Sequence, residues 1–111
     1  MIDEKTINGY IGKYIDISKQ KGVNIDCEIE EVSLEKLRNT LYQFGDILEQ
    51  DIENNMFIVS MKSKFFYANQ TLVCIVLENN KIHYKVYNAT NDLDNNSAKN
   101  IVNKINRKLG I

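Results

Sequence analysis

Apolar residues are densest in Met56–Asn88, where their spacing predicts three successive strands. The stretch Thr71–Leu77 (TLVCIVL) is almost unbroken, as expected for a central strand that is buried on both faces. In the stretch that follows, Ile82, Tyr84 and Val86 alternate with more polar positions, which predicts a strand with one wetter face. We expect the rest of the chain to cover or extend this sheet.

A helix is predicted for Asp3–Lys21, because apolar residues recur there with helical spacing and Gly22 stands where helices commonly end. Within it, Gly9 and Gly12 each cost about 1 kcal/mol relative to alanine. These glycines either allow close packing on the sheet or place a break in the helix near Tyr10.

Three further elements are predicted before the central region. Val23–Ile29 alternates between apolar and polar residues, which indicates a half-buried strand with an acidic outer face. Ser33–Phe44 is predicted as a short helix that begins at the N-cap residue Ser33 and ends at Gly45. Ile47–Glu53 is interpreted as a strand.

The turns depend on asparagine and glycine, because the chain contains no proline. Asn54-Asn55 and Asn79-Asn80 are predicted as turns between antiparallel strands, since asparagine tolerates a positive φ. The neighbouring strands are expected at Met56–Lys64, Asn69–Glu78 and Lys81–Asn88, with a loop or bulge near Phe65–Asn69. A last helix is predicted from Asn96 or Ser97 to Leu109.

These elements predict one α+β domain over residues 1–111, in the order α-β-α-β-β-β-β-α. The sheet is expected to be mainly an antiparallel meander, packed with two longer helices and one short helix. Its central strand Thr71–Leu77 needs cover on both faces. Either the helices are divided between the faces, or a second copy of the chain covers one of them; a homodimer is slightly favoured.

The composition is that of an ordinary globular domain, with 43% hydrophobic and 26% charged residues. Charge is uneven along the chain: residues 1–55 carry twelve acidic and six basic residues, and residues 56–111 carry three acidic and eight basic ones. The halves either present a dipolar surface to a charged partner or interleave in space, and interleaving is the favoured interpretation.

The longest apolar run, Leu72–Leu77, is far shorter than the roughly 20 residues of a membrane span, and no secretion signal is visible. We therefore expect a cytoplasmic protein. Cys27 and Cys74 are interpreted as small buried hydrophobic residues. Two cysteines and one histidine form no recognisable metal-ligand spacing, so no metal site and no cofactor are predicted.

His83 is the single histidine and the natural candidate for acid–base chemistry, but the sequence places no orienting carboxylate beside it. A structural or surface role is favoured, and no catalytic residue is assigned. A small-molecule pocket between sheet and helices remains an alternative, with Tyr67, His83, Tyr84 and Tyr87 as its candidate ligand-binding residues.

Two charged stretches suggest other partners. Asp26, Glu28, Glu30 and Glu31 form an acidic run, interpreted as a solvated strand face in preference to a cation site. Basic and aromatic residues mix at residues 62–67, a composition typical of single-stranded nucleic-acid platforms. The candidate nucleic-acid residues are Lys62, Lys64, Phe66, Lys104 and Arg107.

The run Phe57–Thr90, which ends in VYNAT, with a short helix before it and a closing helix after it, resembles small uncharacterised proteins of low-GC Gram-positive bacteria. The Lys-, Asn- and Ile-rich, proline-free composition is similar to theirs. The resemblance implies a compact α+β fold and no particular activity or site.

The function favoured by the sequence is that of a non-enzymatic binding or regulatory protein, which contacts itself as a homodimer or contacts another protein. A small-molecule-binding protein or minor enzyme is the first alternative. A nucleic-acid-associated protein is the second and less favoured one.

Overall fold

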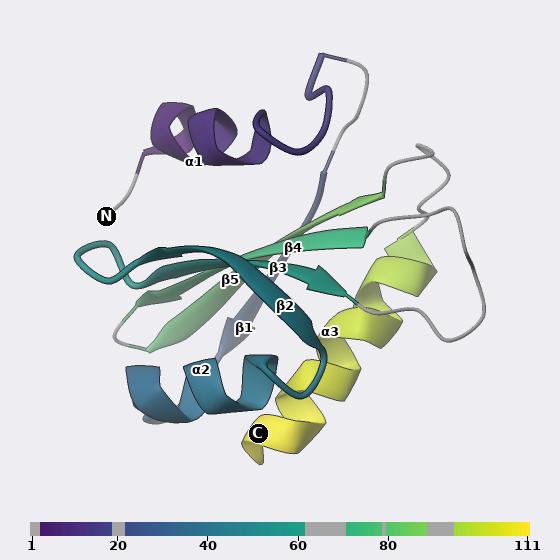
Figure 1. Ribbon diagram of the computed structural model, residues 1–111. Coiled ribbons are helices and arrows are strands. Elements are labelled where there is room, and N and C mark those ends of the chain that lie inside the picture. Colours follow the sequence, from purple (N-terminus) through teal and green to yellow (C-terminus); the bar gives the residue numbers. More distant parts are fainter. Residues whose placement is uncertain (1–2, 19–21, 62–70, 79, 89–94) are drawn as a thin grey trace.

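The computed structural model describes residues 3–18, 22–61, 71–78, 80–88 and 95–111. These residues form a single α+β domain in which five antiparallel strands make one sheet (Figure 1), in the order β1-β5-β4-β3-β2. Both the fold class and the element order predicted from the sequence are confirmed. The elements are α1 (Glu4–Ile11), β1 (Val23–Glu28), α2 (Leu34–Leu41), β2 (Gly45–Asp51), β3 (Met56–Met61), β4 (Thr71–Glu78), β5 (Lys81–Asn88) and α3 (Asn95–Leu109).

The helices are divided between the two faces of the sheet, with α2 and α3 on one side and α1 on the other (Figure 1). The α2/α3 side holds the larger core, in which Leu37, Leu41 and Ile105 pack against the sheet. The α1 side holds a smaller core built by Ile11 and Ile15. The sheet lies between the two cores, and its strands contribute side chains to both of them.

The central strand β4 is buried on both faces, as its unbroken apolar sequence predicts. Val73 and Ile75 face α2 and α3, whereas Leu72 and Val76 face α1. Because α1 covers the second face within the same chain, burial of that face needs no second copy. The homodimer stays a prediction. The argument that a second copy must cover this face no longer supports it.

The first helix is shorter than the predicted Asp3–Lys21, so that range is wrong at its C-terminal end, and the alternative of a break near Tyr10 agrees with the observed end. The helix stops at Ile11 with Gly12 as its C-cap, and the chain continues as turns through Ser18. The apolar spacing was misleading because Ile15 is buried in the same core even though it follows the helix end. The helix therefore ends at Gly12, one of the two glycines noted above, and not at Gly22.

The remaining boundaries lie close to the predicted ones. Ser33 caps α2, since its hydroxyl accepts a hydrogen bond of 3.1 Å from the backbone N–H of Lys36. Asn55 adopts the expected left-handed conformation, with φ 53°, in the turn before β3. The prediction of a loop near Phe65–Asn69 and the residue Asn79 of the second turn lie outside the described residues.

Candidate functional site

The sheet has two edge strands, β2 and β1, which differ in the regularity of their pairing. The β2 edge is irregular, because the register between β2 and β3 shifts between Ile47 and Glu49. A bulge of this kind bends and twists the strand and so hinders pairing with another chain. The β2 edge is therefore poorly suited to accept a further strand.

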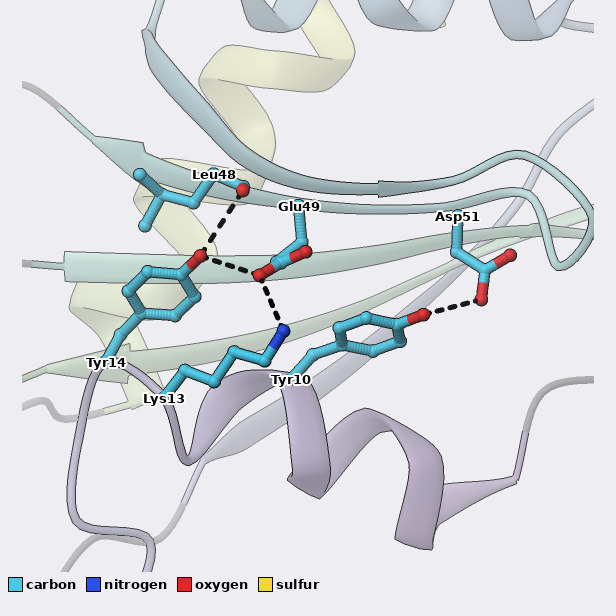
Figure 2. A network of polar contacts seen from close by, with 6 residues as sticks. All are labelled: Tyr10, Lys13, Tyr14, Leu48, Glu49 and Asp51. Carbon is cyan, nitrogen blue, oxygen red and sulfur yellow. Dashed lines mark hydrogen bonds and ion pairs between the residues drawn. The ribbon is translucent and has the colours of Figure 1, made fainter.

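Side chains of α1 and the turn after it also bind β2 (Figure 2). The Tyr14 hydroxyl donates to Oε1 of Glu49 at 2.7 Å and lies 3.3 Å from the carbonyl oxygen of Leu48. The Tyr10 hydroxyl donates to Oδ2 of Asp51 at 3.1 Å. Two long aromatic side chains thus reach from the α1 side to this edge strand, and one of them, Tyr14, contacts a backbone acceptor of the strand.

The pKa shifts of this network agree with its geometry. The hydrogen bond from Tyr14 and the ion pair with Lys13, whose Nζ lies 3.2 Å from Oε1 of Glu49, hold the pKa of Glu49 below its ordinary value. The same hydrogen bond raises the pKa of the Tyr14 hydroxyl. At neutral pH the phenol is therefore a donor and the carboxylate an acceptor, which fixes α1 against β2.

The β1 edge, in contrast, is regular. Its six residues pair with β5 without a register shift, from Val23 opposite Val86 to Glu28 opposite Lys81. The ladder continues beyond the strand, where the backbone N–H of Ile29 donates to the carbonyl oxygen of Asn80 at 3.0 Å.

Hydrogen bonding alternates along an antiparallel strand, so the bond made by Ile29 fixes which way each β1 peptide group points. Val23, Ile25 and Cys27 direct their N–H and C=O groups toward β5, as Ile29 does. The groups of the intervening residues point away from the sheet; these residues are Asn24, Asp26 and Glu28. The outer edge therefore offers three residues with backbone donors and acceptors directed outward.

The two faces of β1 differ in chemistry. Asn24, Asp26 and Glu28 are exposed and lie on the α1 side, while Val23, Ile25 and Cys27 are half-buried against the α2/α3 core. On that side the Tyr84 hydroxyl donates to Oδ1 of Asn106 at 2.7 Å. The amide nitrogen of Asn106 in turn donates to Cys27 Sγ at 3.3 Å. This chain of contacts ties α3 to both β5 and β1 and holds the edge strand in place.

The two halves of the chain share the sheet and the α2/α3 layer, but their charges separate by layer and do not mix. Helices α2 and α3 carry six basic residues and one acidic residue, Glu35. The strand positions that face α1 carry mainly acids, and the basic residues among them are Lys81 and Lys85. These acids are Asp26, Glu28, Asp46, Glu49, Asp51 and Glu78.

His83 lies between two of these carboxylates. Its Nδ1 is 2.8 Å from Oδ1 of Asp26, its cross-strand neighbour on β1. Its Nε2 is 3.2 Å from Oε2 of Glu78, an ion-pair distance at which the geometry makes no hydrogen bond. Burial lowers the pKa of His83, but the hydrogen bond with Asp26 and the contact with Glu78 outweigh it, so the pKa is raised overall. The imidazole thus joins β1, β5 and β4 on this face.

A raised pKa in the folded state means that His83 stabilises the fold in its protonated form. This contribution is complete below the unfolded pKa of about 6.5 and is lost as the pH rises through the higher folded pKa. We expect the free energy of unfolding, measured with urea, to fall as the pH rises from about 6.5 through the raised folded pKa. A His83→Gln variant should lose this slope, and an unchanged slope in the variant would contradict the assignment.

The described candidate ligand-binding residues are divided between the two faces of the sheet. His83 and Tyr87 face α1, whereas the Tyr84 side chain is buried on the opposite face beside α3. Tyr67 lies outside the described residues. A cavity of about 240 Å³ does lie between α1 and the sheet, and Tyr84 is among its lining residues. These are Glu4, Ile7, Asn24, Cys74, Val76, His83, Tyr84 and Lys85.

The cysteines are both free, and they lie on opposite faces of the sheet. Burial raises the pKa of Cys74 to about 12, so its thiol stays protonated and unreactive at neutral pH although it lines the cavity beside His83. Among the described residues, no group of three or more histidine, cysteine or acidic side chains could hold a metal ion.

Of the candidate nucleic-acid residues, Lys104 and Arg107 lie on the exposed face of α3. Lys62, Lys64 and Phe66 lie outside the described residues, so the structure does not bring the two groups together. No helix among the described residues is long and apolar enough to cross a membrane.

Sequence reasoning missed three features of this surface: the place of β1 at the edge of the sheet formed by the described strands, the contacts of Asp26 and Glu78 with His83, and the tyrosine contacts with β2. The expectation that no carboxylate orients His83 is therefore wrong. The alternation of Val23–Ile29 identified the faces of β1 but not its place in the sheet. No protein-family model, no curated protein and no solved structure matches the chain, so the resemblance to small bacterial proteins stays a prediction.

Proposed function

We propose that this protein is a non-enzymatic binding protein that works through protein–protein contacts and accepts an extended segment of a partner along β1. The observation that carries the proposal is the outward direction of the peptide groups at Asn24, Asp26 and Glu28 on a regular edge strand. Strand addition to such an edge forms backbone hydrogen bonds of the kind that hold the sheet itself together.

The contrast between the two edges supports this proposal. Open edges invite aggregation, and folded proteins normally bulge, cover or charge them. Here β2 is both bulged and bound by Tyr14, whereas β1 is regular and carries only the charges of Asp26 and Glu28. An edge that is kept soluble by charge stays available to a partner of suitable charge. The two free thiols fit a reducing, cytoplasmic setting.

The test is an NMR titration with three short synthetic peptides that have valine at alternate positions. The intervening positions hold lysine in one peptide, threonine in the second and glutamate in the third, so all three have the same capacity for backbone pairing. We expect at least one peptide to bind, with amide shifts centred on β1. Binding by none of the three would overturn the proposed function.

The Asn24→Pro variant gives the decisive comparison. The N–H of Asn24 points outward, so proline there removes a donor that β5 does not use and leaves the fold intact. We expect Asn24→Pro to weaken peptide binding severely, while the matched control Asn24→Ala, which keeps the N–H, binds normally. Equal binding by both variants would show that the peptide does not pair with β1.

A further inference from the structure

We infer that the segment accepted by β1 is basic, with lysine or arginine at alternate positions that face Asp26 and Glu28. This inference rests on the proposed function and names the chemistry of the partner: an extended segment of another protein in which basic residues alternate with apolar ones. It is carried by the position of the two carboxylates relative to the outward peptide groups.

The spacing on β1 sets the spacing of the partner. Asp26 and Glu28 are two residues apart, so their side chains emerge on the same face of the sheet. Any strand paired with β1 places alternate side chains on that face, opposite or diagonal to these acids. The other face of the partner would lie beside half-buried Val23 and Ile25, where apolar residues fit.

The carboxylates stay accessible in spite of their neighbours. The Asp26 side chain keeps 64% of its surface exposed while it contacts His83. Of the two lysines on this face, Lys81 lies opposite both Glu28 and Glu78, and Lys85 is 3.4 Å from Glu4 of α1, so acids already neighbour each of them. Two further exposed acids, Glu30 and Glu31, come after Ile29, the residue that follows β1. The electrostatic potential along the outer edge of β1 is therefore negative, and a bound basic segment would neutralise part of this charge.

The same charges argue against a second copy of this chain as the occupant. If two β1 strands paired about a two-fold axis, Asp26 and Glu28 would lie opposite or diagonal to the same acids of the other copy. Like charges at cross-strand positions are destabilising. Self-pairing would also bring both acidic stretches at residues 26–31 into one assembly.

The test uses the same three peptides at low ionic strength. We expect the lysine peptide to bind wild-type protein about tenfold more tightly than the glutamate peptide, with the threonine peptide between them. In the double variant Asp26→Lys, Glu28→Lys the order should reverse. The milder double variant Asp26→Asn, Glu28→Gln, which guards against misfolding, should bind all three with similar affinity.

The matched control is the double variant Glu35→Lys, Glu53→Lys, which changes the net charge equally at two exposed positions outside β1. It should keep the preference for lysine, because the effect depends on charges at the edge and not on total charge. Equal affinity of the three peptides for β1 would overturn this inference and leave the proposed function intact. Binding by none of them would overturn the function itself.

Discussion

Gly45→Ala is expected to destabilise the fold by about 3 kcal/mol, because the new methyl group would overlap backbone atoms of the neighbouring strand. A Cβ at this position would lie 1.9 Å from the carbonyl oxygen and 2.8 Å from the carbonyl carbon of Ser60. Both are backbone atoms of β3, the strand that pairs with β2. The methyl group therefore forces the two strands apart, and urea unfolding measures the loss.

Gly9→Ala is the matched control for this prediction. A Cβ at Gly9 would meet no atom within 4 Å, and the residue lies inside α1. Alanine is favoured over glycine in a helix interior by up to about 1 kcal/mol, so this variant should be as stable as wild type or more stable. Equal stability of the two alanine variants would contradict the close approach of β2 and β3 at Gly45.

Ile11→Ala is expected to reduce the free energy of unfolding by about 2 to 3 kcal/mol, because Ile11, the last residue of α1, is fully buried against the sheet. Loss of its side chain weakens the cover over the second face of the sheet, where Met56, Ile58 and Leu72 are also fully buried. We expect the variant to bind a hydrophobic dye and to self-associate more than wild type. Chemical unfolding and sedimentation measure the two effects.

The control is Ile17→Ala, which removes the same side chain from a residue six positions later. Ile17 is 38% exposed, so its loss should change stability by no more than about 0.5 kcal/mol. If Ile11→Ala were as stable as Ile17→Ala, α1 would not be the cover of this face. The argument for a homodimer through that face would then regain its basis.

The fold was largely predictable from the sequence because its apolar pattern reflects local burial directly. Leu72–Leu77 is apolar throughout because it lies between two cores, and Lys81–Asn88 follows two asparagines in the sequence. The end of the first helix was not predictable in this way. Ile15 keeps the helical spacing of its apolar neighbours, but the chain has already left the helix at Gly12.

The candidate site was less predictable, because it depends on strand order. Asp26 and His83 are 57 residues apart in sequence and become cross-strand neighbours only when β1 pairs with β5. The sequence identified both residues, one in an acidic run and the other as the single histidine, but it contained no signal that joined them. Likewise, the alternation in Val23–Glu28 shows which side chains of β1 are exposed. It does not show whether β1 has a neighbouring strand on one side or on both.

The two layers of charge have the same origin. The acidic first half of the chain contributes both edge strands, β1 and β2, whose acids face α1, whereas the basic second half contributes α3 on the opposite side. The halves share both the sheet and the α2/α3 layer, since α2 comes from the first half and α3 from the second. A surface of this kind favours partners of opposite charge at each face, and the acidic one coincides with the open edge.

Amide hydrogen exchange along β1 tests the central claim most directly. In the free protein we expect the amides of Ile25 and Cys27 to be protected and those of Asn24, Asp26 and Glu28 to exchange rapidly. Saturation with the lysine peptide should then protect all three outward amides. Protection of these amides in the free protein would show that the edge is already occupied, and rapid exchange in the presence of saturating peptide would show that β1 accepts no strand.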